Sequence, residues 1–260
     1  MSQTTLPVLE AVDIWRRFGQ VEALRGASLA VYPQEVVALI GDNGAGKSTL
    51  IRCLAGADKP NSGQILVDGE PVEFDSPLAA RAHGIETLYQ DLALATDLDA
   101  YSNMYLGREL FLPNLPRFLH VLDRRRMRQE SDEAMRSLGV EVRDTKSPVR
   151  SLSGGQRQIV AVARAVAWAK RVVIMDEPTA ALGVRQRALV LDVIRRVRDQ
   201  GIAVVLVSHN MPEVLEVSDR VEVLRLGRRV ARFNRGEAGL TDLVGAMTGA
   251  LVNEPEAEES

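Results

Sequence analysis

The chain has 260 residues, 46% of them hydrophobic and 26% charged, a composition that is ordinary for a soluble globular protein. This length allows one large domain, or a domain with a subdomain, around a substantial core. The net charge of −3 gives no electrostatic reason to expect nucleic acid as the main partner. The single cysteine, Cys53, excludes an internal disulfide and a cysteine-cluster metal site, and we expect it to be buried.

The sequence predicts neither a secretion signal nor a membrane-spanning segment. Met1–Leu9 lacks a basic region followed by an apolar stretch. The chain has no run of about 18 apolar residues, the length needed to cross a bilayer. We therefore expect a protein of the reducing cytosol that meets a membrane only through a partner.

The first 90 residues combine strand patterns with one strand–loop–helix unit. The predicted strands cover 8–14, 27–32, 35–40, 64–67, 70–72 and 85–89, and the predicted helices cover 49–55 and 77–83. After Glu35, the strand predicted at 35–40 is continuously apolar, which is typical of a buried parallel strand. Turns at 18–20 and at Asp68-Gly69 join neighbouring strands. This part of the chain therefore predicts an antiparallel β part beside a nucleotide-binding βα unit.

The loop of that unit reads Gly41-Asp42-Asn43-Gly44-Ala45-Gly46-Lys47-Ser48-Thr49 and fits the phosphate-binding pattern G-x-x-x-x-G-K-[ST]. The glycines let backbone N–H groups turn towards phosphate oxygens, and the helix N-terminus adds partial positive charge. Lys47 would contact the β- and γ-phosphates, and the Ser48 hydroxyl would ligate Mg²⁺. A chance glycine-rich turn would not have this strand before it and this helix after it, so we predict a nucleotide site.

Residues 91–165 have helical rather than strand patterns, at 101–106, 123–138 and 156–169 among other places. We therefore predict a helical subdomain over about 91–165, inserted into an α/β body over about 8–90 and 166–240. The run Arg124–Arg128 could form a nucleic-acid patch. Acidic residues follow it at helical spacing, however, which favours a solvated helix face.

The last third returns to alternating strands and helices. The predicted strands cover 171–177, 203–209, 220–226 and 229–233, and the predicted helices cover 183–200, 211–218 and 240–247. The last two strands have the pattern of a hairpin. We predict a single domain over 1–240, followed at 241–260 by a terminal helix and an acidic, disordered tail.

Two carboxylates, Asp176 and Glu177, end an apolar strand, where open α/β sheets present groups to a ligand. Many surface strands end in acids, so the pair is informative because a phosphate-binding loop precedes it. Four apolar residues followed by an acid match the Walker B pattern. Asp176 would hold Mg²⁺ through its water shell, and Glu177 would polarise the water that attacks the γ-phosphate.

A second anion site is predicted at Leu152-Ser153-Gly154-Gly155-Gln156, which opens an alanine-rich helix. A flexible turn with an N-cap would explain the Ser-Gly pair but not the whole sequence. The stretch matches the LSGGQ signature of ATP-binding cassette (ABC) ATPases, and the chain resembles that family over residues 8–235.

Other positions follow the same resemblance. Phe18 stands where the family places the aromatic that stacks on adenine, and Gln90 resembles the Q-loop glutamine that contacts Mg²⁺ and the membrane partner. His209 resembles the switch histidine that contacts the γ-phosphate, although a lone histidine at a strand end is more often structural. Asp176-Glu177-Pro178-Thr179 is similar to the extended Walker B motif.

The resemblance implies an α/β fold, that of a P-loop NTPase with a mixed sheet, an N-terminal antiparallel β part and an inserted α-helical subdomain. It implies binding and hydrolysis of ATP with Mg²⁺. The implied catalytic residues are Glu177, His209, Lys47 and Gln90, and the implied Mg²⁺ ligands are Ser48, Gln90 and Asp176. The implied nucleotide contacts are Phe18, Gly41, Asp42, Asn43, Gly44, Ala45, Gly46, Lys47, Ser48 and Thr49, with Ser153, Gly154, Gly155 and Gln156 acting in trans.

The family also implies partners. Two copies would form a head-to-tail dimer with each ATP between one phosphate-binding loop and the other chain's signature. Integral membrane permease subunits would receive the motion, and an extracytoplasmic sugar-binding protein would complete the system. The chain would then be cytoplasmic and peripheral on the inner face of the membrane, with no nucleic acid partner.

Several stretches resemble monosaccharide importers of the ribose, xylose and fructose type. They lie at 41–47, 55–57, 76–81, 87–92 and 179–184. The alternative is a soluble ABC ATPase acting as a regulatory or nucleic-acid-associated module. An importer subunit needs an apolar groove near 91–110 for a permease helix, and this region contains Leu92, Leu94, Leu98, Tyr101, Met104, Tyr105 and Leu106.

One position departs from the family. After Walker B the usual Ser-Ala-Leu-Asp is replaced by Ala180-Ala181-Leu182-Gly183. The absent carboxylate normally helps to link the two nucleotide sites of the dimer. Gly183 is therefore expected to change how the sites are coupled, and not whether ATP binds.

Overall fold

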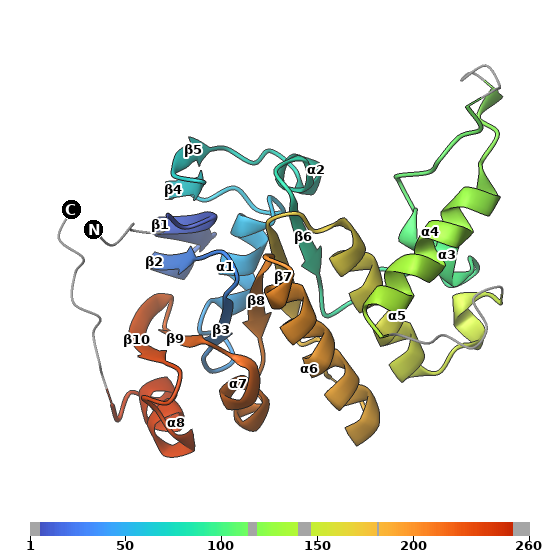
Figure 1. Cartoon of the computed structure of the whole chain (residues 1–260). Helices are drawn as coiled ribbons and strands as arrows, with labels where there is room; N and C mark the ends of the chain where they lie inside the picture. The colour runs from blue at the N-terminus through green and yellow to red at the C-terminus, as the bar shows by residue number, and fades with distance from the viewer. Residues whose placement is uncertain (1–5, 114–118, 140–146, 181, 252–260) are drawn as a thin grey trace, which may run out of the picture.

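The computed structural model describes residues 6–113, 119–139, 147–180 and 182–251. Two β-sheets and their helices form the body, and helices α3 to α5 lie at the end opposite the four-stranded sheet (Figure 1). The acidic tail predicted at 255–260 lies outside the described residues.

The smaller sheet is antiparallel and has the strand order β2-β1-β4-β5. Its strands are β1 (Leu9–Phe18), β2 (Val21–Val31), β4 (Ser62–Val67) and β5 (Glu70–Val72). The predicted turns at 18–20 and 68–69 join β1 to β2 and β4 to β5. The predicted antiparallel part is thus confirmed.

The larger sheet has the order β10-β9-β3-β8-β7-β6 and is parallel except for β10, which pairs antiparallel with β9. Its strands are β3 (Val36–Ile40), β6 (Ile85–Leu88), β7 (Val172–Asp176), β8 (Ala203–Val207), β9 (Arg220–Arg225) and β10 (Arg228–Asn234). This mixed sheet confirms the predicted fold class.

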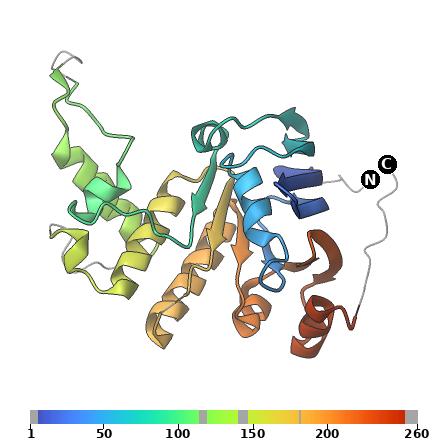
Figure 2. The same ribbon diagram turned by 180° about the vertical axis from the view of Figure 1, so that it is seen from behind.

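The helices of the described residues are α1 (Lys47–Leu54), α2 (Pro77–Ala82), α3 (Ala100–Met104), α4 (Arg124–Ser137), α5 (Gly154–Trp168), α6 (Val184–Asp199), α7 (Met211–Val217) and α8 (Leu240–Thr248). In both ribbon views α5 lies on the far side of β6 from α1 (Figures 1 and 2). The positions of α1 and α5 matter because each begins at one of the two predicted anion sites.

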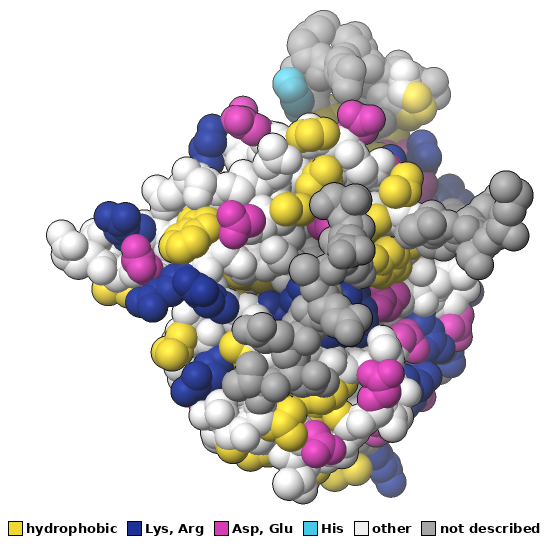
Figure 3. All heavy atoms as spheres, turned by 90° about the vertical axis from the view of Figure 1, so that its left-hand side faces the viewer, with side chains coloured by type: hydrophobic (Ala, Val, Ile, Leu, Met, Phe, Trp, Pro, Cys, Tyr) yellow, Lys and Arg dark blue, Asp and Glu magenta, His cyan; other side chains and the backbone are white. Residues whose placement is uncertain are grey.

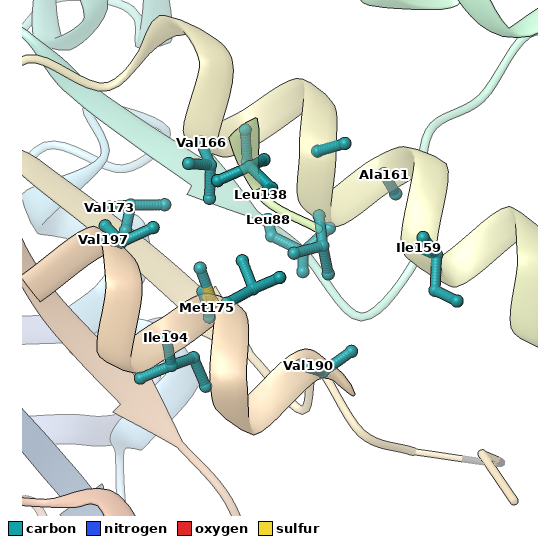
Figure 4. Close-up of a cluster of buried hydrophobic side chains, with 14 of the residues drawn as sticks. Leu88, Leu138, Ile159, Ala161, Val166, Val173, Met175, Val190, Ile194 and Val197 are labelled. Carbon is teal, nitrogen blue, oxygen red and sulfur yellow. The ribbon is translucent and has the colours of Figure 1, made fainter. Parts of the chain in front are cut away.

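The two faces of the larger sheet pack against different elements, because successive side chains of a strand point to opposite faces. Val37 and Leu39 of β3 belong to a core shared with α1 and the smaller sheet. On the other face, side chains of β7 and β8 meet α5 and α6 in a second cluster that includes Met175, Ile159 and Ile194 (Figure 4). The strands that end at the site are therefore held from both sides.

Cys53 is buried at 1% exposure within the core around α1, as predicted. The arginine run of α4 has its predicted solvated face, since Arg124, Arg125 and Arg126 are exposed while Met127 is buried. On the face nearest the two chain ends, apolar side chains are interspersed with charged ones (Figure 3). Among the described residues, no helix combines the length and apolar character needed to cross a bilayer.

Candidate nucleotide-binding site

Four neighbouring parallel strands, β3, β8, β7 and β6, bring four predicted site segments to the same end of the larger sheet. Leu88, Met175, Leu206 and Ala38 are register partners across β6, β7, β8 and β3. Gln90 and Glu177 each follow within two residues of this row, and the phosphate-binding loop and His209 each follow within three. Because carboxyl ends of parallel strands share an edge, the four segments lie side by side there.

The phosphate-binding loop, residues 41–49, has the backbone geometry that the glycines were expected to supply. Gly44 and Gly46 have φ of 80° and 106°, a conformation that side-chain-bearing residues rarely adopt. A Cβ on Gly46 would also lie 2.7 Å from the backbone oxygen of Ala23, in β2. The smaller sheet thus presses directly on the loop and fixes its path.

Lys47 is the first residue of α1, and its ammonium lies inside the curve of the loop. Its Nζ donates hydrogen bonds to the backbone oxygens of Gly41, at 2.6 Å, and Asp42, at 3.0 Å. Burial lowers the pKa of Lys47, and the nearby Glu177 and Asp176 carboxylates partly oppose this. The charge is therefore positioned by backbone carbonyls and faces the acidic end of β7.

Asp176 and Glu177 differ in their surroundings. Burial, together with the neighbouring charge of Glu177, raises the pKa of Asp176, while Lys47 counteracts the rise. Glu177 leaves the strand with a φ of 53°, and its backbone N–H donates to the Val207 oxygen at 2.9 Å. This turn directs the Glu177 carboxylate to His209, whose Nδ1 lies 2.8 Å from Glu177 Oε2.

His209 is 76% exposed at its side chain, whereas Glu177 is 15% exposed. The imidazole therefore stands at the solvent-facing side of the edge and is held there by a more deeply placed carboxylate. Its contact with Glu177 is also one that a hydrogen-bonded structural histidine at a strand end would make, whereas its exposure leaves the ring accessible to a ligand.

The other two predicted contacts, Gln90 and Phe18, lie at the periphery. Gln90 is exposed, two residues beyond β6. Phe18 ends β1 with 45% of its surface exposed, and the Arg16 guanidinium lies 4.7 Å from the ring centroid. Both side chains are accessible to a ligand.

The predicted signature, residues 153–156, begins α5 and does not join this edge within one chain. Ser153 caps the helix, its Oγ accepting from the Gln156 N–H at 3.3 Å, and Gln156 Oε1 accepts from the Ser153 N–H at 2.9 Å. Ser153 and Gly154 are exposed. This segment is a second helix N-terminus, and the helix that it begins has 15 residues. It faces away from α1 (Figures 1 and 2).

Residues 24–180 match the family model described as ABC transporter, which covers more than half of the chain. The chain belongs to the ABC transporter family. Fructose import ATP-binding protein FrcA of Rhizobium meliloti is 47% identical over 246 residues, 94% of this chain and 95% of the relative. Xylose/arabinose import ATP-binding protein XylG of Sulfolobus acidocaldarius is 42% identical, with 93% and 94% covered.

A ribose import ATP-binding protein of Rubrobacter xylanophilus is 43% identical, and the chain spans 48% of its length. Among solved structures, an ABC transporter cassette in its ADP conformation superposes with a TM-score of 0.76 at 21% identity, covering 94% of this chain and 96% of that one. A dimeric cassette with ADP and phosphate gives 0.74 at 23% identity, with 89% and 100% covered. The fold is thus the ABC cassette fold, and the chain is an ATP-binding, ATP-hydrolysing protein of this family.

Gly183, where the resemblance predicts a carboxylate, is the N-cap of α6. Gln186 supplies the capping contact, because its Oε1 accepts from the Gly183 N–H at 3.1 Å. The same amide packs against the signature, since a Cβ on Gly155 would lie 3.1 Å from Gln186 Nε2. Gln186 therefore connects the start of α6 to the start of α5 where a carboxylate was expected.

The metal donors predicted for this site include only one carboxylate. Among the described residues no group of three or more His, Cys, Asp or Glu side chains forms a metal cluster. The predicted donors are the Ser48 hydroxyl, the Gln90 amide and the Asp176 carboxylate. All three are oxygen donors, the type that Mg²⁺ prefers when phosphate oxygens complete its shell, so their chemistry fits Mg²⁺.

Sequence reasoning missed three residues that join the site to its supports, Gln158, Arg187 and Glu213. It named Thr179 only as part of the extended Walker B motif and gave it no such role. Glu213 had a sequence signal, because it stands three residues after Asn210, the spacing of a capping box. That spacing predicts an exposed cap, but Glu213 is buried at 5% exposure. Two of its partners, Thr179 and Arg187, come from other segments of the chain, which no local pattern could indicate.

Proposed function

We propose that this protein is the ATPase subunit of an importer that takes up a monosaccharide such as fructose, ribose or xylose through separate membrane permease subunits. The observation that carries this proposal is the end-to-end match to the fructose and xylose/arabinose import proteins, which covers at least 93% of both chains. The same relatives give no support to a regulatory or nucleic-acid-associated module. An extracytoplasmic sugar-binding protein would deliver the sugar, and this chain would be peripheral on the cytoplasmic face.

A cavity beside the Gln90 segment supports a permease contact. Its volume is about 300 Å³. Its lining includes the apolar side chains of Met104, Leu106 and Trp168 and four charged ones, those of Arg81, Glu86, Arg108 and Arg164. Leu106 is 47% exposed at its rim. The predicted groove is thus partly apolar and smaller than its sequence suggested, because Tyr101 and Tyr105 lie in the helical core.

Within this proposal the loop at 41–49 binds the phosphates of ATP. Its backbone N–H groups would surround the phosphate oxygens, and Lys47 would exchange its two carbonyl contacts for the β- and γ-phosphates. Phe18 would stack on adenine. Ser48, Gln90 and Asp176 would hold Mg²⁺, which neutralises charge on the phosphates when bound.

Glu177 and His209 carry the chemistry. Glu177 would accept a hydrogen bond from the attacking water and raise its nucleophilicity. His209, held by Glu177 at 2.8 Å, would donate to the γ-phosphate and stabilise the charge that develops there. The exposure of His209 supports this role, because a γ-phosphate must arrive from the solvent side of the edge.

The exposed signature supports a head-to-tail dimer as part of the proposal. Ser153, Gly154, Gly155 and Gln156 of a second copy would cover the γ-phosphate and close the site. The capping box of α5 already satisfies two backbone groups, and the free N–H groups beside it are the ones available to an anion.

The test is reconstitution of the chain with its permease in liposomes, with labelled fructose, ribose and xylose offered in turn. We expect ATP-dependent uptake of one of these sugars and loss of turnover in Glu177→Gln, which should still bind ATP. Glu73→Gln, a surface exchange remote from the edge, is the matched control. Uptake of none of the sugars, with ATP hydrolysis intact, would overturn the sugar assignment. Near-normal hydrolysis by Glu177→Gln would remove Glu177 from its role.

A further inference from the structure

Glu213 is a buried carboxylate with partners in three separate segments of the chain. It lies in the first turn of α7, and its side chain is 6% exposed. A buried charge is costly unless it is paired and hydrogen-bonded, so its partners must hold their positions. Thr179 Oγ1 donates to Oε2 at 2.6 Å, Asn210 Nδ2 donates to Oε1 at 3.0 Å, and Arg187 Nε is ion-paired with Oε1 at 2.8 Å.

Two of these partners adjoin the residues that carry the chemistry. Thr179 is two residues after Glu177, and Asn210 directly follows His209. Glu177 and His209 also touch each other. This contact, the two hydrogen bonds of Glu213 to Thr179 and Asn210, and the short backbone stretches 177–179 and 209–210 therefore form a closed ring. Glu213 is the member of this ring that anchors the exposed histidine loop to the buried body.

The turn after Glu177 is also tied to the signature helix. Gln158, one turn into α5, is 7% exposed, and its Nε2 donates to the Pro178 oxygen at 2.8 Å. Pro178 and Thr179 are consecutive, so this short turn is held by α5 on one side and by Glu213 on the other. The third partner, Arg187, belongs to the first turns of α6, which Gly183 caps.

We propose that Gln158, the Pro178–Thr179 turn and Glu213 link the signature helix to the histidine loop of the same chain, with Glu213 as a positioning residue for His209. A displacement of α5 shifts the Pro178 carbonyl, and the Thr179–Glu213 hydrogen bond passes this shift to Asn210 and His209. The inference rests on the proposed dimer, in which α5 of one chain contacts the partner's ATP. Closure of the dimer around the ATP that one chain's α5 contacts would therefore change the position of His209 at the other ATP site, which belongs to the same chain as that α5.

This link has particular weight in this chain, because Gly183 lacks the carboxylate that normally helps to couple the two sites. Arg187 connects α6 to the same network through its ion pair with Glu213. In this pair the arginine is partly exposed and the glutamate is buried. Communication between the sites therefore runs through buried side chains behind the edge, rather than through an acid at the start of α6.

The experiment compares ATP hydrolysis by the full chain with Thr179→Val, which removes the hydroxyl at nearly constant volume, and Thr179→Ser, which restores it. We expect Thr179→Val to lower kcat about tenfold and to bring the Hill coefficient for ATP close to one, with KM changed less than twofold. Thr179→Ser should match the wild type. Glu216→Gln, on α7 and in an exposed pair with Arg195, is the control and should also match.

A double-mutant cycle completes the test. If Thr179 and Glu213 act as one link, Thr179→Val combined with Glu213→Gln should be no slower than the slower single variant. Three results would overturn the inference. The first is a double variant whose loss of kcat is the product of the two single losses, and the second is an unchanged Hill coefficient in Thr179→Val. The third is a rise in KM that accounts for the loss of activity in Thr179→Val. If the wild-type protein hydrolyses ATP but no sugar is taken up, only the importer proposal is refuted. The link between the signature helix and His209 is tested by ATP hydrolysis and does not depend on sugar uptake.

Discussion

The two predicted phosphate-binding helix N-termini of this protein are built in opposite ways. The loop before α1 is enclosed by its own chain, so a Cβ on Gly41 would overlap the Leu224 backbone oxygen and one on Gly46 would come within 2.7 Å of Ala23. The start of α5 is open, and a Cβ on Gly154 would meet nothing within 4 Å. The fold requires glycine at Gly41 and Gly46 of the first site, whereas it leaves the glycine at position 154 of the second site unexplained.

This difference shows where each site is completed. The first has its shape fixed by β2, β9 and the sheet edge before any ligand arrives. At the second, the space in front of Gly154 is available to something outside the chain. A second copy of the protein is the occupant that the proposed function requires. Glycine-to-alanine substitutions, which add one methyl group, can distinguish the site enclosed by its own chain from the site that is open to a partner.

The largest effect is expected at the enclosed site. Gly46→Ala places a side chain at a φ of 106° and against β2, which should cost about 2 kcal/mol or more of the free energy of unfolding. ATP binding should be lost as well, because the loop must change its path. Urea unfolding and binding of a fluorescent ATP analogue would measure both. A variant of native stability that binds ATP would contradict the enclosed-site description.

At the open site the fold should tolerate the same change. Gly154→Ala should alter the free energy of unfolding by less than about 1 kcal/mol, since alanine suits a helix and the space is free. The single chain should bind ATP normally, while hydrolysis by the dimer should fall at least tenfold. Thermal unfolding, equilibrium binding and turnover would be compared. Unimpaired hydrolysis would show that no partner approaches Gly154.

A smaller effect is expected on the stability of the protein, because the partly buried Asp176 carboxylate at the sheet edge is unfavourable when it is ionised. Because the folded state raises the pKa of Asp176 above its ordinary value of 3.8, the ionised form is disfavoured on folding. The stability from this group is complete at low pH and is lost as pH rises through the raised pKa. Asp176→Asn should therefore unfold at a higher temperature than the wild type at pH 7 without nucleotide, and the gap should close towards pH 4.

The same variant should lose Mg²⁺-dependent hydrolysis. Asp192→Asn, at an exposed position of α6, serves as the control and should show no such pH-dependent gap. An Asp176→Asn protein less stable than the wild type at pH 7 would show that Lys47 outweighs burial at this carboxylate.

The smallest effect is expected in the solvent access of two thiols, Cys53 in the core around α1 and a cysteine introduced at position 151 before α5. Burial raises the pKa of the Cys53 thiol to about 11, so almost no thiolate forms at pH 8. The native protein should therefore resist Ellman's reagent and react fully in guanidinium chloride. Ser151→Cys, just before the signature and exposed, should add one thiol that reacts at once. Rapid reaction of Cys53 would show that α1 opens easily.

Most of the fold could be predicted from the sequence because its elements carry local signals. The strands predicted at 35–40 and 203–209 contain the continuous apolar runs 36–40 and 203–207, and these runs are the central parallel strands β3 and β8. The pairing of β1 with β4 was not predicted, since residues 19–61 separate the two strands and the hydrophobic pattern does not specify a neighbour.

The site divides in the same way. The loop at 41–49 and the Asp176-Glu177 pair were predicted because contiguous residues carry the chemistry, and the register of four strands then brings the segments together. Glu213 was missed because its importance depends on Thr179 and Arg187, more than 25 residues earlier in the chain. A sequence pattern shows which groups could act, whereas only the packing shows which group holds them.

The backbone of Glu177 has a consequence for engineering. Its φ of 53° is one that glycine or asparagine adopts more readily, so a glutamate there costs about 1 kcal/mol. The polypeptide keeps this conformation because the N–H contact to Val207 and the turn to Pro178 impose it. A library of variants screened for heat resistance alone would therefore be enriched in Gly or Asn at position 177. It would yield robust proteins that no longer turn over ATP.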